Sequence, residues 1–288
     1  MKTIGNTNDE WAKELINFIP KNNKKTIILV SIFSQIFLTS FTKILGFKTI
    51  WLGTNSDNNK ILNMLLKIIS NFSDFIIVPN QNTEAKYLRI GIKSKKIHVI
   101  YPPCEQNTTT KPSKNNIVIS CDGLITTDQG LGVLIQSINS VKEIIPNIKL
   151  IIGGKIADAQ RINWIIKHLK LNNNVQILPT ESKTWVASSH IYVLPTPENI
   201  PAPCSIIQAM MFSKAVIATD KLAHHEFIEQ NKNGILIKQN NVDMLTQAII
   251  NLARNKEWVA KLGENNFKFA KQKFSIEVFE KKIQEILN

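Results

Sequence analysis

Cysteine is scarce in this sequence of 288 residues. The three cysteines, Cys104, Cys121 and Cys204, are too few and too scattered for a disulfide framework or a cysteine-rich zinc site. This scarcity fits a reducing compartment, so we expect a cytoplasmic protein. The opening residues are polar and mixed in charge, and we therefore expect no signal peptide.

Acidic residues are also few. The chain has 22 of them against 35 lysines and arginines, which gives a net charge of +13 and a pI near 9.6. Such a charge favours polyanionic partners, either nucleotides or an anionic membrane that the protein contacts peripherally. A compositional bias toward lysine and asparagine would produce the same charge without any such partner. The sequence lacks a zinc-finger spacing and the aromatic pattern of RNA-binding sheets, so we expect no nucleic-acid partner.

One long run, Thr26 to Thr42, has no charged residue. A membrane-spanning helix needs about 20 predominantly apolar residues, and this run contains polar residues at positions 31, 34, 35, 39 and 40. We therefore expect a buried strand over Thr26 to Ile32, and then a helix over Ser34 to Leu45 that ends at Gly46. The alternative is an accessory protein anchored in a membrane through Thr26 to Leu45.

Strand and helix patterns alternate along the whole chain, which is typical of parallel sheets covered by helices. The expected strands are 26–32, 49–52, 75–78, 98–100, 117–120, 149–152, 175–178, 191–194, 215–219 and 234–237. The expected helices are 9–18, 34–45, 60–72, 83–89, 131–145, 158–169, 185–188, one that opens near 203, 242–255 and a helical region that runs to 287.

The polar stretch 105–115 has no apolar period and contains a proline, so we expect a linker there. The predicted fold is α/β, with two Rossmann-like parallel-sheet domains at residues 1–105 and 106–274. The first of these is short, with no strand expected before Thr26. We expect the last helix, within 275–288, to pack back on the first domain.

The most informative segment runs from Ile191 to Thr219. A strand leads into a proline-rich loop, an apolar helix follows, and a second strand closes the segment. The first-turn N–H groups and the dipole of such a helix favour an anion, and a phosphate would fit there. Glu198 in the loop and Gln208 in the helix could then bind sugar hydroxyl groups. An ordinary crossover with a surface glutamate and a packing amide fits the same pattern.

This segment resembles the nucleotide-sugar site of the retaining glycosyltransferases with two Rossmann-like domains, of GT-B type (glycosyl transferases group 1). The matching residues are Pro195-Thr196, Glu198, Gln208-Ala209-Met210 and Ala215 to Thr219. Further similar stretches are 73–80, 91–92, 96–103, 123–131, 151–154 and 219–226. The family usually has Glu, seven residues and then Glu-Ala-Met. Here Glu198 stands ten positions before Gln208, and the second acid is an amide.

The resemblance implies transfer of a hexose from a nucleoside diphosphate sugar to a lipid-linked or polysaccharide acceptor, with retained anomeric configuration. It implies no obligatory metal, and the sequence has no Asp-x-Asp motif. Glu198 would orient the sugar as the catalytic residue. The nucleotide-sugar-binding candidates are Gly123, Gln129, Gly130, Gly153, Gly154, Leu178, Cys204, Ser205 and Gln208.

The chain departs from the family at the diphosphate clamp. Where the family has an arginine and a lysine, this sequence has Gly123 and Gln129. Cationic groups there stabilise the charge that builds on the leaving diphosphate, and losing such donors lowers the rate by orders of magnitude. The acceptor-domain histidine of the family also has no counterpart. A catalytically silent relative, which binds a nucleotide sugar or a partner transferase, is therefore the alternative function.

Two further patterns have simple structural explanations. Gly153-Gly154 could allow a ligand to approach closely or could only form the turn after a strand. His224 and His225, followed by Glu226, suggest a metal site at first sight. Adjacent side chains on a strand or helix point apart, however, so we expect no metal there.

Overall fold

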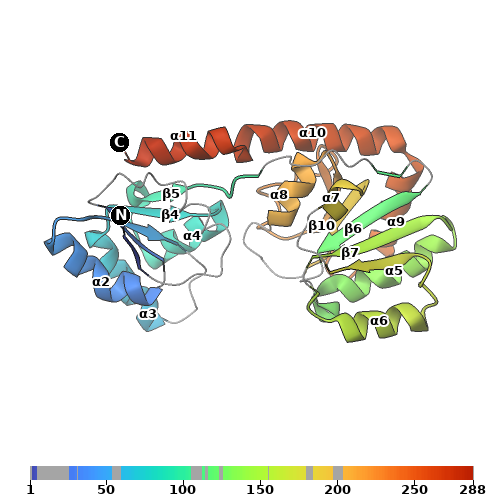
Figure 1. Cartoon of the computed structure of the whole chain (residues 1–288), viewed down its shortest axis with the longest axis horizontal. Coiled ribbons are helices and arrows are strands. Elements are labelled where there is room, and N and C mark those ends of the chain that lie inside the picture. The colour runs from blue at the N-terminus through green and yellow to red at the C-terminus, as the bar shows by residue number, and fades with distance from the viewer. Residues whose placement is uncertain are drawn as a thin grey trace. The chain divides into compact units, whose positions relative to one another are not determined.

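The computed structural model describes residues 2–4, 26–30, 32–53, 60–104, 112–113, 116–122, 126–154, 156–179, 184–196 and 204–287 of the chain. The chain divides into two compact units: unit 1 is Met1–Pro103 with Lys273–Asn288, and unit 2 is Cys104–Gln272. Each unit contains one parallel sheet with helices packed on it (Figure 1). The predicted α/β fold with two parallel-sheet domains is therefore confirmed.

The sheet of unit 1 has five parallel strands in the order β1-β2-β3-β4-β5. Their bounds are β1 Lys2–Ile4, β2 Thr26–Leu29, β3 Lys48–Leu52, β4 Phe75–Val78 and β5 Ile97–Val99. Because strands follow one another in chain order and crossovers are right-handed, the connecting helices cover one face of the sheet. These helices are α2 (Ile32–Ile44), α3 (Lys60–Ile69, extended by a 3-10 turn over Ser70–Phe72) and α4 (Gln81–Ile90). Leu66 of α3 and Tyr87 of α4 pack there against Leu29, Trp51 and Ile76.

The opposite face of this sheet is covered by the last helix of the chain, α11 (Ile276–Leu287). Its side chains Phe279, Ile283 and Ile286 have the i, i+4, i+7 spacing of one helix face. They form a single apolar cluster with alternate strand residues, including Ile28 and Ile50. The C-terminal residues therefore complete the core of the unit in which the chain begins.

The sheet of unit 2 has six strands in the order β11-β10-β9-β6-β7-β8. Their bounds are β6 Ile117–Asp122, β7 Ile148–Gly153, β8 Val175–Leu178, β9 Ile191–Leu194, β10 Ala215–Thr219 and β11 Gly234–Ile237. The chain adds β7 and β8 on one side of β6, and then β9, β10 and β11 on the other. This creates a topological switch point between β6 and β9, where doubly wound sheets bind their ligands.

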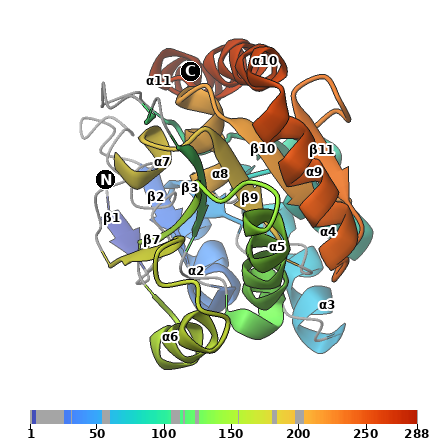
Figure 2. The same ribbon diagram turned by 90° about the vertical axis from the view of Figure 1, so that its right-hand side faces the viewer.

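Six helices accompany this sheet. They are α5 (Gly132–Lys142), α6 (Ala159–His168), α7 (Thr184–Ala187), α8 (Cys204–Met211), α9 (Val242–Arg254) and α10 (Lys256–Phe274). Helices α5 and α9 pack against one another beside the strands (Figure 2), with the Ser137 hydroxyl donating to the Val242 carbonyl over 3.2 Å. All residues of the neighbouring strands β9 and β10 are buried, as continuous apolar runs require.

Several predicted bounds need correction. The strand expected over 26–32 ends at Leu29, and α2 already begins at Ile32, because the Gln35 amide donates to the carbonyls of Leu29 and Leu52 and closes both strand ends. The helix expected over 131–145 is α5, which follows a π-helical turn at Thr127–Leu131. Strand β1 was not predicted, since three residues carry too little pattern to be recognised.

Other predictions concern residues that the structure does not describe. The helix expected over 9–18 lies outside the described residues, as does most of the linker 105–115.

Gly46 ends α2 with a φ of +75°, as expected for a helix-terminating glycine. Among the helices that the structure describes, none is long and apolar enough to cross a membrane.

Candidate functional site

The candidate site lies at the carboxyl edge of the unit 2 sheet, where the loops after β6 and β9 meet. Gly130, in the turn before α5, has a φ of +105°. A Cβ atom at this position would lie only 2.1 Å from the Pro195 carbonyl oxygen, directly after β9. The two loops are therefore in backbone contact at the switch point. Pro195 and Thr196 are both buried there.

Polar contacts hold the turn that contains Gly130. The Thr127 hydroxyl donates to Asp158 over 2.6 Å, and Arg161 pairs with Asp128 over 2.9 Å. Asp158 immediately precedes α6, so the turn before α5 is fixed to the start of the neighbouring helix. Gln129 lies in this turn, and its side chain is not among those described.

The two adjacent glycines at the end of β7 have different roles. Gly153 is the last residue of β7, and a Cβ atom there would lie 2.2 Å from the indole ring of Trp185. It is therefore a packing glycine. Gly154 has a φ of +86° and donates its N–H to the Leu178 carbonyl over 3.1 Å. Gly154 forms the turn after β7, and Leu178 takes part in this turn through its backbone carbonyl.

Helix α8 follows the β9 loop and is almost entirely buried, as predicted. Its residues Ile206, Ile207, Ala209 and Met210 are all inaccessible or nearly so. Gln208 is partly exposed, but its Oε1 atom is buried and has no hydrogen-bond partner among the described residues. A buried acceptor without a partner costs about 1–3 kcal/mol, and this cost would disappear if a ligand hydroxyl donated to it.

Several predicted site residues lie outside the described residues. These are Glu198, in the loop 197–203, and Gly123, in the segment 123–125. Cys204 and Ser205 begin α8, but their side chains are not described. The structure therefore brings Gly130, Gly153, Gly154 and Leu178 to one edge of the sheet and places Gln208 on the helix that follows the edge.

Sequence reasoning missed the roles of Trp185 and His224. Trp185 is buried on Gly153, and its indole N–H has no partner in the described part of the chain. A large aromatic residue needs a small residue opposite it, but the sequence does not show that position 153 is opposite position 185.

The two histidines after β10 point in different directions. His224 is fully buried, and its Nδ1 atom lies 2.6 Å from the Thr219 carbonyl oxygen. Burial lowers the pKa of His224, so its ring is neutral at physiological pH. His225 is exposed and contacts Asp220 over 2.6 Å. Within the described ranges, no group of three or more His, Cys, Asp or Glu side chains could hold a metal ion.

Comparison with known proteins identifies the family. The family profile described as "Glycosyl transferases group 1" matches residues 105–269, which is 165 of the 288 residues. This chain belongs to that family. The matched region coincides closely with unit 2, Cys104–Gln272, and ends within α10.

This member of the family has curated relatives of low identity. It is 23% identical over 240 residues to the uncharacterized glycosyltransferase MJ1069 of Methanocaldococcus jannaschii, which covers 77% of this chain and 61% of the relative. It is 33% identical over 85 residues to the poly(ribitol-phosphate) alpha-N-acetylglucosaminyltransferase of Staphylococcus aureus, covering 29% of this chain and 17% of that protein. The chain spans about three fifths or less of the length of these curated relatives.

Solved structures share the fold of this chain. The HepE protein of Anabaena in complex with UDP has a TM-score of 0.81 at 17% identity, covering 96% of this chain and 81% of that one. A glycosyltransferase of Rickettsia africae has a TM-score of 0.76 at 21% identity, covering 100% and 85%. At these identities the likeness establishes the GT-B-like fold alone.

Proposed function

We propose that this glycosyltransferase moves a hexose from a nucleoside diphosphate sugar to a lipid-linked or polysaccharide acceptor, with retained anomeric configuration. The observation that carries the proposal is the contact of Gly130 with the Pro195 carbonyl at the switch point. It joins two loops of the family-matched unit at the place where doubly wound sheets bind nucleotides.

The phosphates would bind to backbone N–H groups. The first turn of α8, at Cys204 and Ser205, presents such groups together with the positive end of the helix dipole. Gly130 has no side chain to obstruct the approach of a phosphate to the turn before α5. Backbone groups thus supply the anion binding in this proposal, and no metal is required.

Two polar side chains would bind the ribose and the transferred sugar. The buried Oε1 atom of Gln208 would accept a hydrogen bond from a ribose hydroxyl, which removes the cost of leaving it without a partner. Glu198, in the loop that leads to α8, would orient the transferred hexose. We propose a uridine diphosphate sugar as the first donor to test, since structures with this fold include complexes with UDP and UDP-glucose.

Calorimetric titration of the full chain with UDP, GDP and ADP, each beside its monophosphate, tests the nucleotide site. Low salt is needed because a basic protein binds anions more weakly as screening increases. We expect one diphosphate to bind about tenfold more tightly than its monophosphate, or about 1.4 kcal/mol. Gln208→Ala should weaken that binding, whereas the exposed helical Gln247→Ala should leave it unchanged. If no nucleotide binds, the proposed site is wrong.

A second candidate function is a catalytically silent glycosyltransferase-like protein that binds a nucleotide sugar or a partner transferase. It is favoured by Gly123 and Gln129, which replace the cationic clamp of the family. The double variant Gly123→Arg with Gln129→Lys separates the two functions. A silent protein should gain sugar transfer, measured by release of UDP from UDP-glucose with a lipid-linked acceptor. An active wild-type enzyme with unchanged turnover in the variant would exclude the silent function.

A further inference from the structure

Helix α2 buries a row of polar side chains and exposes large apolar ones. Its fully or nearly fully buried side chains include Gln35, Thr39 and Thr42. Its large exposed apolar side chains are Phe37, Phe41 and Ile44, and with the adjoining Leu45 they are between 56% and 82% accessible. The apolar stripe of a helix usually faces the core, whereas here Ile36 and Leu38 pack only partly buried against it.

The buried polar side chains are bound within unit 1. Gln35 donates to two strand-end carbonyls, over 2.9 Å and 3.2 Å. The Trp51 indole donates to the Thr39 hydroxyl over 2.8 Å, and the hydroxyls of Thr42 and Thr49 are 2.9 Å apart. These hydrogen bonds fix the rotation of α2 about its axis, so its apolar stripe must point away from the sheet.

Helix α3 continues the same apolar surface. Ile61, Met64, Leu65 and Ile68 follow the i, i+3, i+4, i+7 spacing of one helix face, and Phe72 extends it. All five are exposed, and α3 packs beside α2. Together with the adjoining Leu45 and Phe72, the two helices carry nine of the fourteen exposed large hydrophobic side chains in the described part of the chain. We call this surface the α2–α3 face.

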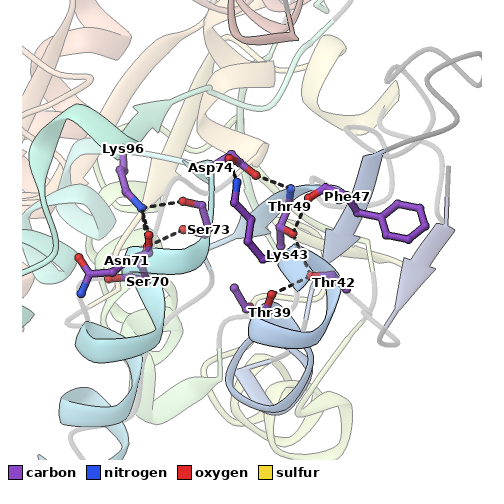
Figure 3. A network of polar contacts seen from close by, with 10 residues as sticks. All are labelled: Thr39, Thr42, Lys43, Phe47, Thr49, Ser70, Asn71, Ser73, Asp74 and Lys96. Carbon is purple, nitrogen blue, oxygen red and sulfur yellow. Dashed lines mark hydrogen bonds and ion pairs between the residues drawn. The ribbon is translucent and has the colours of Figure 1, made fainter. Parts of the chain in front are cut away.

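Polar contacts at the ends of α2 and α3 hold these two helices in place (Figure 3). The Lys96 ammonium group donates to the carbonyls of Ser70, Asn71 and Ser73, which close the end of α3. Asp74 accepts from the Thr49 N–H and pairs with Lys43 near the end of α2. Both helix ends are thus attached to the sheet, so the exposed apolar side chains are held in place.

Charge indicates what covers this face. Helices α2 and α3 contain no aspartate or glutamate. Lys43 is paired with Asp74, and α3 adds the exposed Lys60 and Lys67. A second copy of the chain would bring like charges together at this face. An anionic bilayer would instead accept the apolar side chains among its acyl chains and pair the lysines with its headgroups.

We propose that the α2–α3 face docks unit 1 onto anionic phospholipid membranes. With 13 and 10 residues, α2 and α3 are about 20 and 15 Å long at 1.5 Å per residue. A hydrocarbon core is about 30 Å thick, so these helices lie in the interface and do not span it. Docking itself does not depend on the transfer reaction. If the proposed function holds, docking also brings the protein to a lipid-linked acceptor, and this part rests on the proposed function.

Co-sedimentation of the full chain with lipid vesicles tests this proposal. One set contains phosphatidylcholine alone, and the other contains equal parts of phosphatidylcholine and phosphatidylglycerol. Ile44→Glu with Ile61→Glu alters two of the most exposed positions of the face, 82% and 70% accessible. The matched control is Ile144→Glu with Trp164→Glu, two exposed apolar residues of unit 2 with the same change of charge.

The wild type should bind the phosphatidylglycerol vesicles and bind phosphatidylcholine vesicles more weakly. The α2–α3 variant should lose at least tenfold in partitioning, while the control should partition as the wild type does. Circular dichroism of both variants checks that they are folded. The proposal is overturned if the wild type does not bind the anionic vesicles, or if both double variants bind equally. Light scattering adds a third test, of the oligomeric state. If the wild type is a dimer that does not bind vesicles, and only the α2–α3 variant is a monomer, the face binds a second copy of the chain and the proposal is wrong.

Discussion

At the scale of single residues, Gly130 is fixed by a contact with a distant part of the chain. Its positive φ favours glycine, and the Pro195 carbonyl leaves no room for a side chain. The sequence predicts a site at Gly130 because it precedes a helix, but the contact with Pro195 could not be predicted, since nothing local relates the two positions. Gly154 shows the opposite case, because a turn after a strand is readable from Gly153-Gly154 themselves.

This difference makes a prediction for two alanine substitutions in unit 2. Gly154→Ala places a side chain at a φ of +86° with no atom closer than 3.8 Å to the new Cβ. Only the left-handed backbone conformation then lowers the free energy of unfolding, by about 1–2 kcal/mol. Gly130→Ala has a similar conformational cost and also requires the loop after β9 to move. We therefore expect it to lower the free energy of unfolding by about 1–3 kcal/mol more. Urea unfolding of both variants measures this, and equal losses would show that the loops separate easily.

At the scale of elements, strands were predicted best where a short apolar run is sharply bounded, as in β4, β8 and β9, each of which ends directly before a proline. Strands β4, β8, β9, β10 and β11 have the predicted bounds. The inverted polarity of α2 was not predictable in the same way. A periodic pattern shows which side chains share a face of a helix, but not which face lies inside. In α2 two hydrogen bonds to strand β3 decide which face lies inside: Gln35 donates to the Leu52 carbonyl, and Thr39 accepts from the Trp51 indole. The helical pattern contains no sign of either partner.

The packing of α11 gives a prediction at this scale. Ile283 is buried in the cluster on the second face of the unit 1 sheet, so Ile283→Ala should leave a cavity there. We expect a loss of about 2–5 kcal/mol in the free energy of unfolding of unit 1. Gln284→Ala, at the exposed neighbouring position, should change it by less than about 0.5 kcal/mol. Thermal unfolding followed by near-UV circular dichroism compares the two variants. Similar melting temperatures would mean that α11 adds little to this core.

At the scale of the whole molecule, alternation of strands and helices was enough to predict two parallel-sheet domains. The candidate site was predictable in part. The sequence placed Gly130, Gly153, Gly154 and Leu178 at strand ends or helix starts, and the order of the six strands then gathers these positions at one edge. That order depends on packing between strands far apart in the chain. The shortening of the first domain and the role of Glu198 stay predictions.

Helix α11 also determines the order in which the protein can mature during translation. Unit 2 is one continuous segment, Cys104–Gln272, so all of its residues leave the ribosome before α11 does. Unit 1 is discontinuous in sequence, and one face of its sheet stays open to water until Phe279, Ile283 and Ile286 have also left the exit tunnel. The nascent chain therefore carries an uncovered apolar sheet while unit 2 is being made, and a polypeptide that stops before Phe279 leaves that face bare.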